Sequence, residues 1–153
     1  MATFSGRSYV GQFDASKLIG SIRDGAHQGV GKAGAALQRH YKLMLNKPGP
    51  NKTRHTGDVY TQKSGPSKGQ TETIRASAPG EPPRYRTRDL LNSVQYEYEG
   101  DTVVRVGTHL KYGLILELGL GRLKGPRPWL RLGLVQMQNE ISRIILASIK
   151  KGK

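Results

Sequence analysis

Residues 112–134 read YGLILELGLGRLKGPRPWLRLGL, and this stretch joins two segments of apolar sequence through a sharp bend. An apolar run ends at Glu117, a glycine-rich segment follows, and the chain bends through Pro126 and Pro128 before Trp129, the only tryptophan. Three interpretations fit this pattern. The chain folds back on itself, it forms a ligand site, or it presents a surface to a partner.

The sequence on each side of the bend indicates a helix. Before it, residues 110–118 could be a strand or a short helix, and the spacing of Leu110, Leu114 and Leu118 favours the helix. After it, Pro128 suits a first helical turn, where its missing N–H is no loss. A helix to about Lys150 is predicted by the apolar positions Leu130, Leu134, Met137, Ile141, Ile144, Ile145 and Ile149. We expect Trp129 to pin this helix to a sheet rather than face a partner.

Glu117 stands in an apolar setting, where a raised pKa is conceivable. We instead favour a carboxylate at a helix end that accepts hydrogen bonds from the backbone or from a neighbour's arginine.

Upstream of the bend, the sequence predicts a β-hairpin. VQYEYE places Val94, Tyr96 and Tyr98 on one face, with Gln95, Glu97 and Glu99 on the other. Gly100-Asp101 suits a two-residue type II′ turn, and the return strand TVVRVG sets Arg105 across from the glutamates. Thr87 is predicted to cap a short helix over 88–92.

A long first helix is predicted from Asp14 or Ser16 to just before Pro48. Its apolar positions are Leu18, Ile22, Ala26, Ala33, Leu37, Tyr41 and Met44. Five glycines lie in it, and each costs up to about 1 kcal/mol relative to alanine. Either they allow a neighbouring backbone to approach closely, or this is simply a poor helix.

The remaining segments complete one domain over residues 14–150. Residues 1–13 form an N-terminal arm, and 151–153 form a basic tail. Residues 47–86 are an extended loop, rich in Pro, Gly, Ser, Thr and Lys, and too long for an ordinary connection. It is either a disordered insertion or an arm ordered by a partner, with a short hairpin between Val59-Tyr60 and Thr73-Ile74.

The composition limits the possible functions. The chain has 153 residues, no cysteine and a net charge of +14, so disulfides and thiolate chemistry are excluded. The charge is uneven, because residues 89–119 hold two basic and five acidic residues. The basic remainder could meet DNA or acidic neighbouring subunits. No apolar run suggests a membrane span or a signal peptide, so no membrane partner is expected.

No catalytic or metal site is expected. The four histidines are scattered, and the glycines match no phosphate-binding spacing. Glu97 and Glu99 are more typical of the solvated face of a sheet than of a catalytic pair. We therefore predict no enzyme activity, no cofactor and no metal.

The candidate functional residues are instead interface residues. Basic and aromatic side chains alternate in the long loop, a pattern that can hold phosphate and stack bases or can bind a neighbouring subunit. The predicted interface set is Lys52, Arg54, Tyr60, Lys63, Lys68, Arg84, Tyr85, Arg86, Glu97, Glu99, Arg127, Trp129 and Arg131.

Between residues 77 and 148, motifs in a fixed order resemble the tail-completion (head–tail joining, or neck) family of long-tailed bacteriophages. They are SAPGEPPRYRTRDLLNSV, VGTHLKYGLILELG and RPWLRLGL. The matching positions are Pro79, Gly80, Pro82, Pro83, Thr87, Leu90, Ser93, Val106, Gly107, Thr108, Tyr112, Leu116, Glu117, Gly119, Arg127, Pro128, Trp129 and Leu130.

Four positions depart from that pattern. Arg88 replaces the usual glycine after the capping threonine, and Gly113 replaces the alanine after Tyr112. Leu118 and Leu120 stand where an aromatic residue and a threonine are usual.

The resemblance implies an α+β fold, with a long N-terminal helix and a C-terminal helix packed on a small, mostly antiparallel sheet and a long loop or arm. It also implies a structural virion protein at the head–tail junction, present in the host cytoplasm during assembly. Its partners would be copies of itself in a ring (a hexamer or dodecamer), the head connector or adaptor, and the tail terminator or tail tube protein, with non-specific contact to DNA in the channel.

Two alternatives stay open. The first is a tail terminator or another minor tail protein. The second, from a different class, is a stand-alone basic protein that binds DNA without sequence preference.

Overall fold

A computed structural model of the chain describes residues 16–50, 52, 54–63, 65, 67–121, 123 and 125–151, without the side chains of 17 and 18. The predicted arm over 1–13 lies outside the described residues, as do the last two residues of the predicted basic tail.

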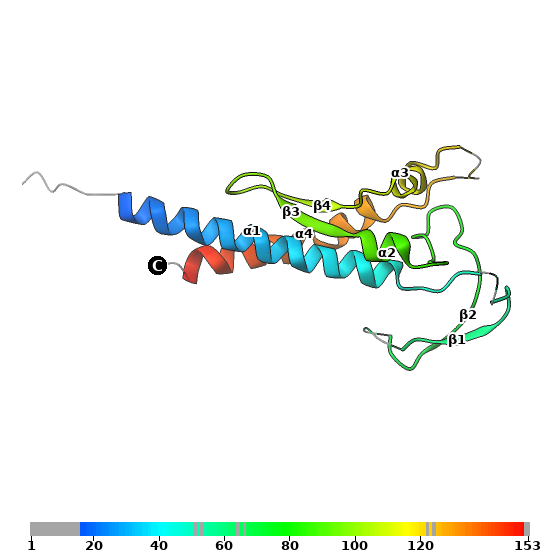
Figure 1. The fold of residues 1–153 in the computed structure, drawn as a ribbon. Helices are drawn as coiled ribbons and strands as arrows, with labels where there is room; N and C mark the ends of the chain where they lie inside the picture. Colours follow the sequence, from blue (N-terminus) through cyan, green and yellow to red (C-terminus); the bar gives the residue numbers. More distant parts are fainter. Residues whose placement is uncertain are drawn as a thin grey trace, which may run out of the picture.

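Two long helices run side by side, and a β-hairpin lies along the first of them (Figure 1). The elements in order are α1 (Ser16–Leu45), β1 (Val59–Thr61), β2 (Thr71–Thr73), α2 (Asp89–Ser93), β3 (Gln95–Tyr98), β4 (Val104–Gly107), α3 (Lys111–Leu118) and α4 (Leu130–Lys151). The predicted α+β class is confirmed, but the strands form two separate antiparallel pairs, β1–β2 and β3–β4, rather than one sheet.

The two ends of the molecule differ. The start of α1 and the end of α4 lie together at one end (Figure 1). The short helix α3 and the hairpin β1–β2 lie at the other.

The glycines of α1 allow close packing, as the first interpretation of them predicted. A Cβ atom at Gly25 would lie 2.9 Å from the Cα of Ile149, and one at Gly29 would lie 3.0 Å from the Cα of Ile145. Gly34 meets the β-hairpin instead, because its Cβ would lie 2.5 Å from Val104 Cγ1. The glycines therefore bring α4 and the hairpin against the backbone of α1.

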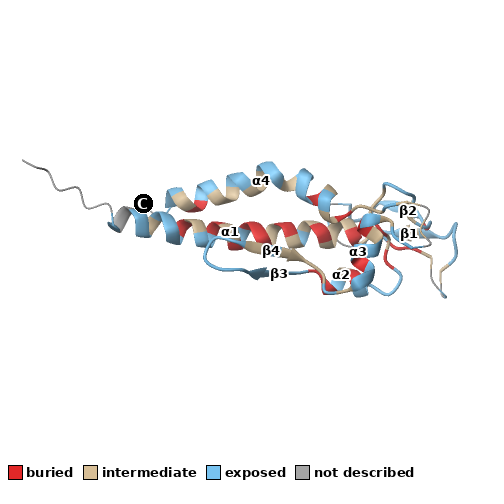
Figure 2. Cartoon of the chain, turned by 90° about the horizontal axis from the view of Figure 1, so that it is seen from above, coloured by how far each residue is buried: buried red, intermediate tan, exposed pale blue. Residues whose placement is uncertain are grey.

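The hydrophobic core lies in the half of α1 nearest α2 and α3. Other buried residues follow α1 along most of its length (Figure 2). Its six buried residues are Leu37, Tyr41, Leu45, Leu90, Val94 and Trp129. On α4, Leu130, Met137 and Ile141 pack against this cluster, but Leu134, which was predicted on the packed face, is 49% exposed. Gly133 faces Tyr41, because a Cβ atom at Gly133 would lie 2.5 Å from Tyr41 Cε1.

The hairpin β3–β4 has the predicted facing pattern but a different turn. Tyr98 pairs with Val104, and Glu97 pairs with Arg105, whose Nε lies 2.5 Å from Glu99 Oε2. The two-residue turn is wrong, because the Glu99 N–H bonds to the Val103 carbonyl and leaves residues 100–102 as the loop.

A tertiary contact explains the wider turn. Asp101, in the middle of the loop, contacts α1. Arg23 pairs with the Asp101 carboxylate, and His27 Nδ1 lies 2.6 Å from the Asp101 carbonyl oxygen. No local pattern in the hairpin sequence carries this information.

Two helix starts also differ from the predictions. Helix α2 begins at Asp89, and Thr87 makes no cap, because its hydroxyl bonds to the Asp89 carboxylate instead. The cap position is Arg88, with φ 70° and no side-chain cap bond. Helix α4 begins at Leu130, so Pro128 precedes the helix rather than lying in its first turn.

The described part of the long loop has internal structure. The predicted hairpin is confirmed as β1–β2, with Tyr60 paired to Glu72. The loop's two ends also meet, because the Gly49 N–H donates to the Tyr85 carbonyl and the Tyr85 N–H donates to the Lys47 carbonyl. Contacts within the chain therefore hold the described part of this segment together.

Among the described residues, no helix combines the length and apolar character that crossing a bilayer requires.

The glycine packing gives a paired test. Gly25→Ala forces α1 and α4 apart, so we expect a loss of about 1–3 kcal/mol in the free energy of unfolding. Gly20→Ala is the matched control, because nothing lies within 4 Å of its Cβ position. It should gain about 0.5–1 kcal/mol. Chemical denaturation measures both, and equal effects at the two sites would contradict the packing role.

Candidate functional site

Glu117 holds the start of α4. Its side chain is buried at the end of α3 and accepts the backbone N–H groups of Trp129 (2.6 Å), Leu130 (2.9 Å) and Arg131 (3.1 Å). The first N–H groups of a helix have no partner within the helix, and their partial positive charge favours an anion. The predicted bonding of Glu117 to backbone is confirmed, and its partners lie twelve to fourteen residues further along the chain.

Trp129 is fully buried beside this cap. Its ring meets Tyr41 of α1 edge-on, with centroids 5.5 Å apart, and its Nε1 donates to the Gly113 carbonyl at 3.3 Å. Trp129 therefore pins α4 to α1 and α3 rather than to a sheet. Its side chain is covered by its own chain and offers no surface to a partner.

Tyr41 completes the junction. Its hydroxyl donates to the Leu130 carbonyl at 2.8 Å. Burial, and then the charge of Glu117, raises the pKa of Tyr41 to about 12. The phenol therefore stays protonated and keeps donating through the neutral range.

The bend folds tightly back on α3. Gly119 has φ 69°, and a Cβ atom there would lie 2.5 Å from the Pro126 nitrogen. The Arg127 N–H donates to the Leu116 carbonyl at 2.7 Å. The bend is thus a corner in which a short helix ends, the chain reverses, and the closing helix starts on the carboxylate of the first.

The proline-glycine loop over residues 77–83 docks on this corner. The Gly80 N–H donates to the Pro126 carbonyl at 2.8 Å. Arg127 Nε donates to the Ser77 hydroxyl at 2.8 Å and to its carbonyl at 3.2 Å.

A second tie links α2 to the end of β4. The hydroxyl groups of Ser93 and Thr108 lie 2.6 Å apart, and Thr108 Oγ1 accepts the Leu110 N–H.

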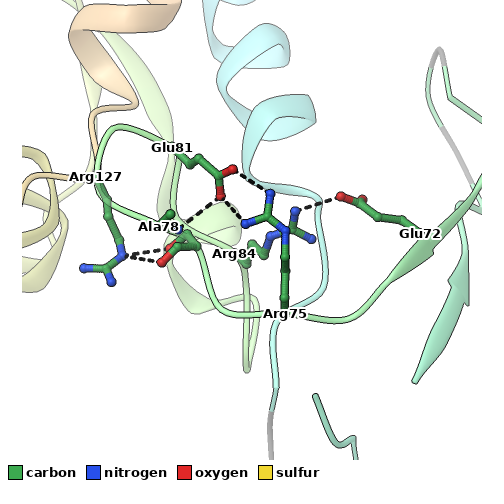
Figure 3. Close-up of polar contacts among 7 residues, drawn as sticks. Glu72, Arg75, Ala78, Glu81, Arg84 and Arg127 are labelled. Carbon is green, nitrogen blue, oxygen red and sulfur yellow. Dashed lines mark hydrogen bonds and ion pairs between the residues drawn. The ribbon is translucent and has the colours of Figure 1, made fainter. Parts of the chain in front are cut away.

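Ion pairs shape the loop between β2 and α2 (Figure 3). Both guanidinium Nη atoms of Arg75 bond the Glu81 carboxylate, at 2.5 and 2.8 Å, and Glu81 also accepts the Ala78 N–H. Arg84 bonds Glu72 at 2.7 Å. These bonds fold residues 75–84 into a compact turn next to the corner.

Beside this turn, arginines surround Tyr85. Its hydroxyl accepts hydrogen bonds from Arg54 and Arg88, and the Arg88 guanidinium lies 4.7 Å from the ring centroid. Arg54 lies 5.4 Å from the Tyr60 ring and 5.8 Å from the Tyr85 ring. The aromatic and basic residues of the loop do come together, but they bind one another.

A cavity of about 990 Å³ lies between the loop and the corner. Its wall is formed by the end of α1, by parts of segments 49–52, 76–77 and 83–91, and by Tyr112, Leu116 and Arg127. We call it the corner cavity.

The predicted interface residues fall into four places. Lys52, Arg84, Tyr85, Arg86 and Arg127 border the corner cavity, and Arg54 and Tyr60 adjoin Tyr85. Lys63 and Lys68 are exposed in the connection of the β1–β2 hairpin. Glu97 is exposed on β3, and Glu99 is exposed directly after β3. Arg131 is exposed in the first turn of α4, whereas Trp129 is buried.

The predicted set omits two acidic residues that the structure shows to matter, Glu72 and Glu81. They position Arg84 and the turn. A signal existed, since both are rare acidic residues in a basic loop, but sequence spacing did not indicate their partners. In the described part of the chain, no three histidine or acidic residues are grouped as a metal site would require.

Comparisons with protein-family models, with curated proteins and with solved structures each returned no match.

The Glu117 cap can be tested by truncation. Glu117→Ala leaves one buried and two part-buried N–H groups without their acceptor, so we expect a loss of about 2–3 kcal/mol in the free energy of unfolding. Glu117→Gln keeps one acceptor oxygen and should lose less. The control Glu97→Ala, on the exposed strand β3, should change the free energy by at most about 0.5 kcal/mol. A Glu117→Ala protein as stable as this control would rule out the cap.

The Glu81 turn predicts a pH dependence. The hydrogen bonds from Arg75, and then from the Ala78 N–H, lower the pKa of Glu81 from 4.5 to about 2. Because the folded pKa is the lower one, the stabilisation is complete above about pH 4.5 and is lost as the pH falls toward 2. NMR titration of the Glu81 carboxyl carbon measures this pKa. Arg75→Gln should return it toward 4.5, whereas Arg143→Gln should leave it unchanged.

Proposed function

We propose that this protein is a structural virion subunit of the tail-completion (neck) type, which forms a ring and joins the head connector to the tail around the DNA channel. Its sequence motifs suggest this class, and the geometry of the corner supports it. The proposal includes no catalysis and no cofactor.

The observation that carries the proposal is the convergence of the motifs in space. The proline-glycine loop, the end of β4, the Leu-Glu turn and the Arg-Pro-Trp segment are separated in sequence. In the structure, the contacts Gly80–Pro126, Ser93–Thr108, Glu117–Trp129 and Gly113–Trp129 connect them. Proteins that share a fold would be expected to keep the motifs whose residues contact one another in this corner.

Arg88, which stands where the family motif usually has glycine, is consistent with the proposed fold. Family members usually have glycine at this position, and Arg88 has φ 70°. It is the only non-glycine residue with positive φ in the part of the chain that the structure describes. The backbone thus adopts the conformation that glycine favours, although the residue is arginine. Its contact with Tyr85 helps to offset the strain.

Exposed apolar side chains support assembly with other subunits. On α3, Leu114 and Leu118 are each 55% exposed, and Ile115 lies between them at 40%. A run of such residues on one short helix is typical of a surface that a partner covers. Within the described ranges, the hairpins β1–β2 and β3–β4 also have edges that no third strand pairs with, and such edges permit strand addition from a neighbour.

The stand-alone DNA-binding alternative gains less support. Five arginines of the described residues (Arg23, Arg75, Arg84, Arg105 and Arg143) are paired with carboxylates of the same chain. Paired guanidinium groups bind phosphate less readily than free ones, because the carboxylate competes for them. We therefore expect any DNA contact to be non-specific and confined to the assembled channel.

The test of function is deletion of the gene in the phage that encodes it. We expect DNA-filled heads and finished tails that do not join, as seen by electron microscopy, and rescue when the protein is supplied in trans. The control supplies Arg143→Gln, which alters an exposed residue of α4 outside the predicted interface set and should rescue as the wild type does. Infectious particles of normal form without the protein would contradict the proposal.

A further inference from the structure

The corner cavity is strongly basic. Lys52, Arg84, Arg86, Arg88 and Arg127 border it, against one acidic residue, Asp89. A concave surface with this excess of positive charge favours an anionic group from outside the chain.

Two of these arginines, Arg84 and Arg127, each have a buried hydrogen-bond donor without an acceptor among the described residues. The Arg84 side chain is 5% exposed and holds Glu72 through Nη2, while Arg127 holds Ser77 through Nε. In each, Nη1 is buried and has no hydrogen-bond partner among the described residues. A buried donor without an acceptor costs about 1–3 kcal/mol, and a charged one costs more.

In each guanidinium, therefore, one nitrogen atom is held by a hydrogen bond and Nη1 lacks an acceptor. The planar group of arginine matches a carboxylate or phosphate, which accepts two N–H bonds at once. Figure 3 shows Arg84 and Arg127 on either side of the loop that holds Ala78 and Glu81. A ligand that bonds both arginines therefore needs two acidic groups. For such a ligand to bind, each guanidinium rotates so that its buried Nη1 faces the cavity.

The rest of the wall favours a peptide over a nucleic acid. Leu45, Leu90 and Leu116 border the cavity together with Tyr112 and Pro50. A phosphodiester strand brings no aliphatic side chain to cover such a surface.

We propose that the corner cavity binds a peptide segment of a partner protein, in which acidic residues alternate with apolar ones. Its carboxylates bond Arg84 and Arg127, and its apolar side chains pack on Leu90 and Leu116. Lys52 and Arg86 at the exposed rim attract the segment. This inference deepens the proposed function, because it names the chemistry of a partner, and it rests on that function only for the partner's place in the particle.

The test uses a fluorescent peptide of sequence DLELEF and the full-length protein at physiological salt. We expect saturable binding by fluorescence polarisation, at least about tenfold tighter than to the uncharged analogue NLQLQF-amide. Arg127→Gln and Arg84→Gln should each weaken binding about tenfold or more. Lys52→Glu should weaken peptide binding severalfold and leaves Arg84 and Arg127 unchanged. This variant therefore tests the cavity even if the Arg84 variant does not fold. Arg143→Gln, on the exposed surface of α4, is the matched control and should bind as wild type.

Three outcomes overturn the inference. The acidic and uncharged peptides bind alike, or neither binds at millimolar concentration, or a fluorescent oligonucleotide binds more tightly than DLELEF with the same dependence on Arg84 and Arg127. Failure here is separable from failure of the proposed function. Unjoined heads and tails in the deletion phage would uphold the neck role even if no peptide bound. Peptide binding would uphold the cavity even if the deletion phage were normal.

Discussion

The corner depends on the Glu117 carboxylate, which accepts the N–H group of Trp129, just before α4, and those of Leu130 and Arg131 at the start of α4. It joins the end of α3 to the start of α4 and so fixes the angle at which the closing helix leaves the bend. That angle brings Trp129 onto Tyr41 and lays α4 along α1. A buried carboxylate is costly unless its oxygens are bonded, and here a helix terminus supplies the bonds. The same arrangement places Arg127 against the proline-glycine loop.

Local pattern predicted most elements of the fold. Helical spacing indicated α1, α3 and α4, and strict alternation indicated β3 and β4 with Arg105 opposite the glutamates. These signals come from residues close in sequence, which face the same side of one element. The glycines of α1 also predicted close packing, although their partners on α4, more than 110 residues away, could not be named from spacing.

Most of the errors come from contacts between residues far apart in the sequence. Asp101 leaves the expected two-residue turn because Arg23 and His27 of α1 hold it. At the start of α2, the Thr87 hydroxyl bonds to the nearby Asp89 carboxylate instead of capping the helix. At the start of α4, the capping group is Glu117, which precedes that helix by more than ten residues. The candidate site follows the same rule. Its basic residues are visible in the sequence, whereas the pairing of Arg84 with Glu72, which leaves one donor unsatisfied, exists only in three dimensions.

The start of α1 and the end of α4 lie together, at the end of the molecule remote from α3 and the corner cavity (Figure 1). This polarity makes the chain directional. One end is rich in contacts between motifs, and the other, among the described residues, holds the start of α1 and the end of α4. A small domain fused beyond Lys151 would mark that second end without touching the corner. In a reconstruction of the proposed ring, its density would tell which end of each subunit points inward, toward the axis, and which points out.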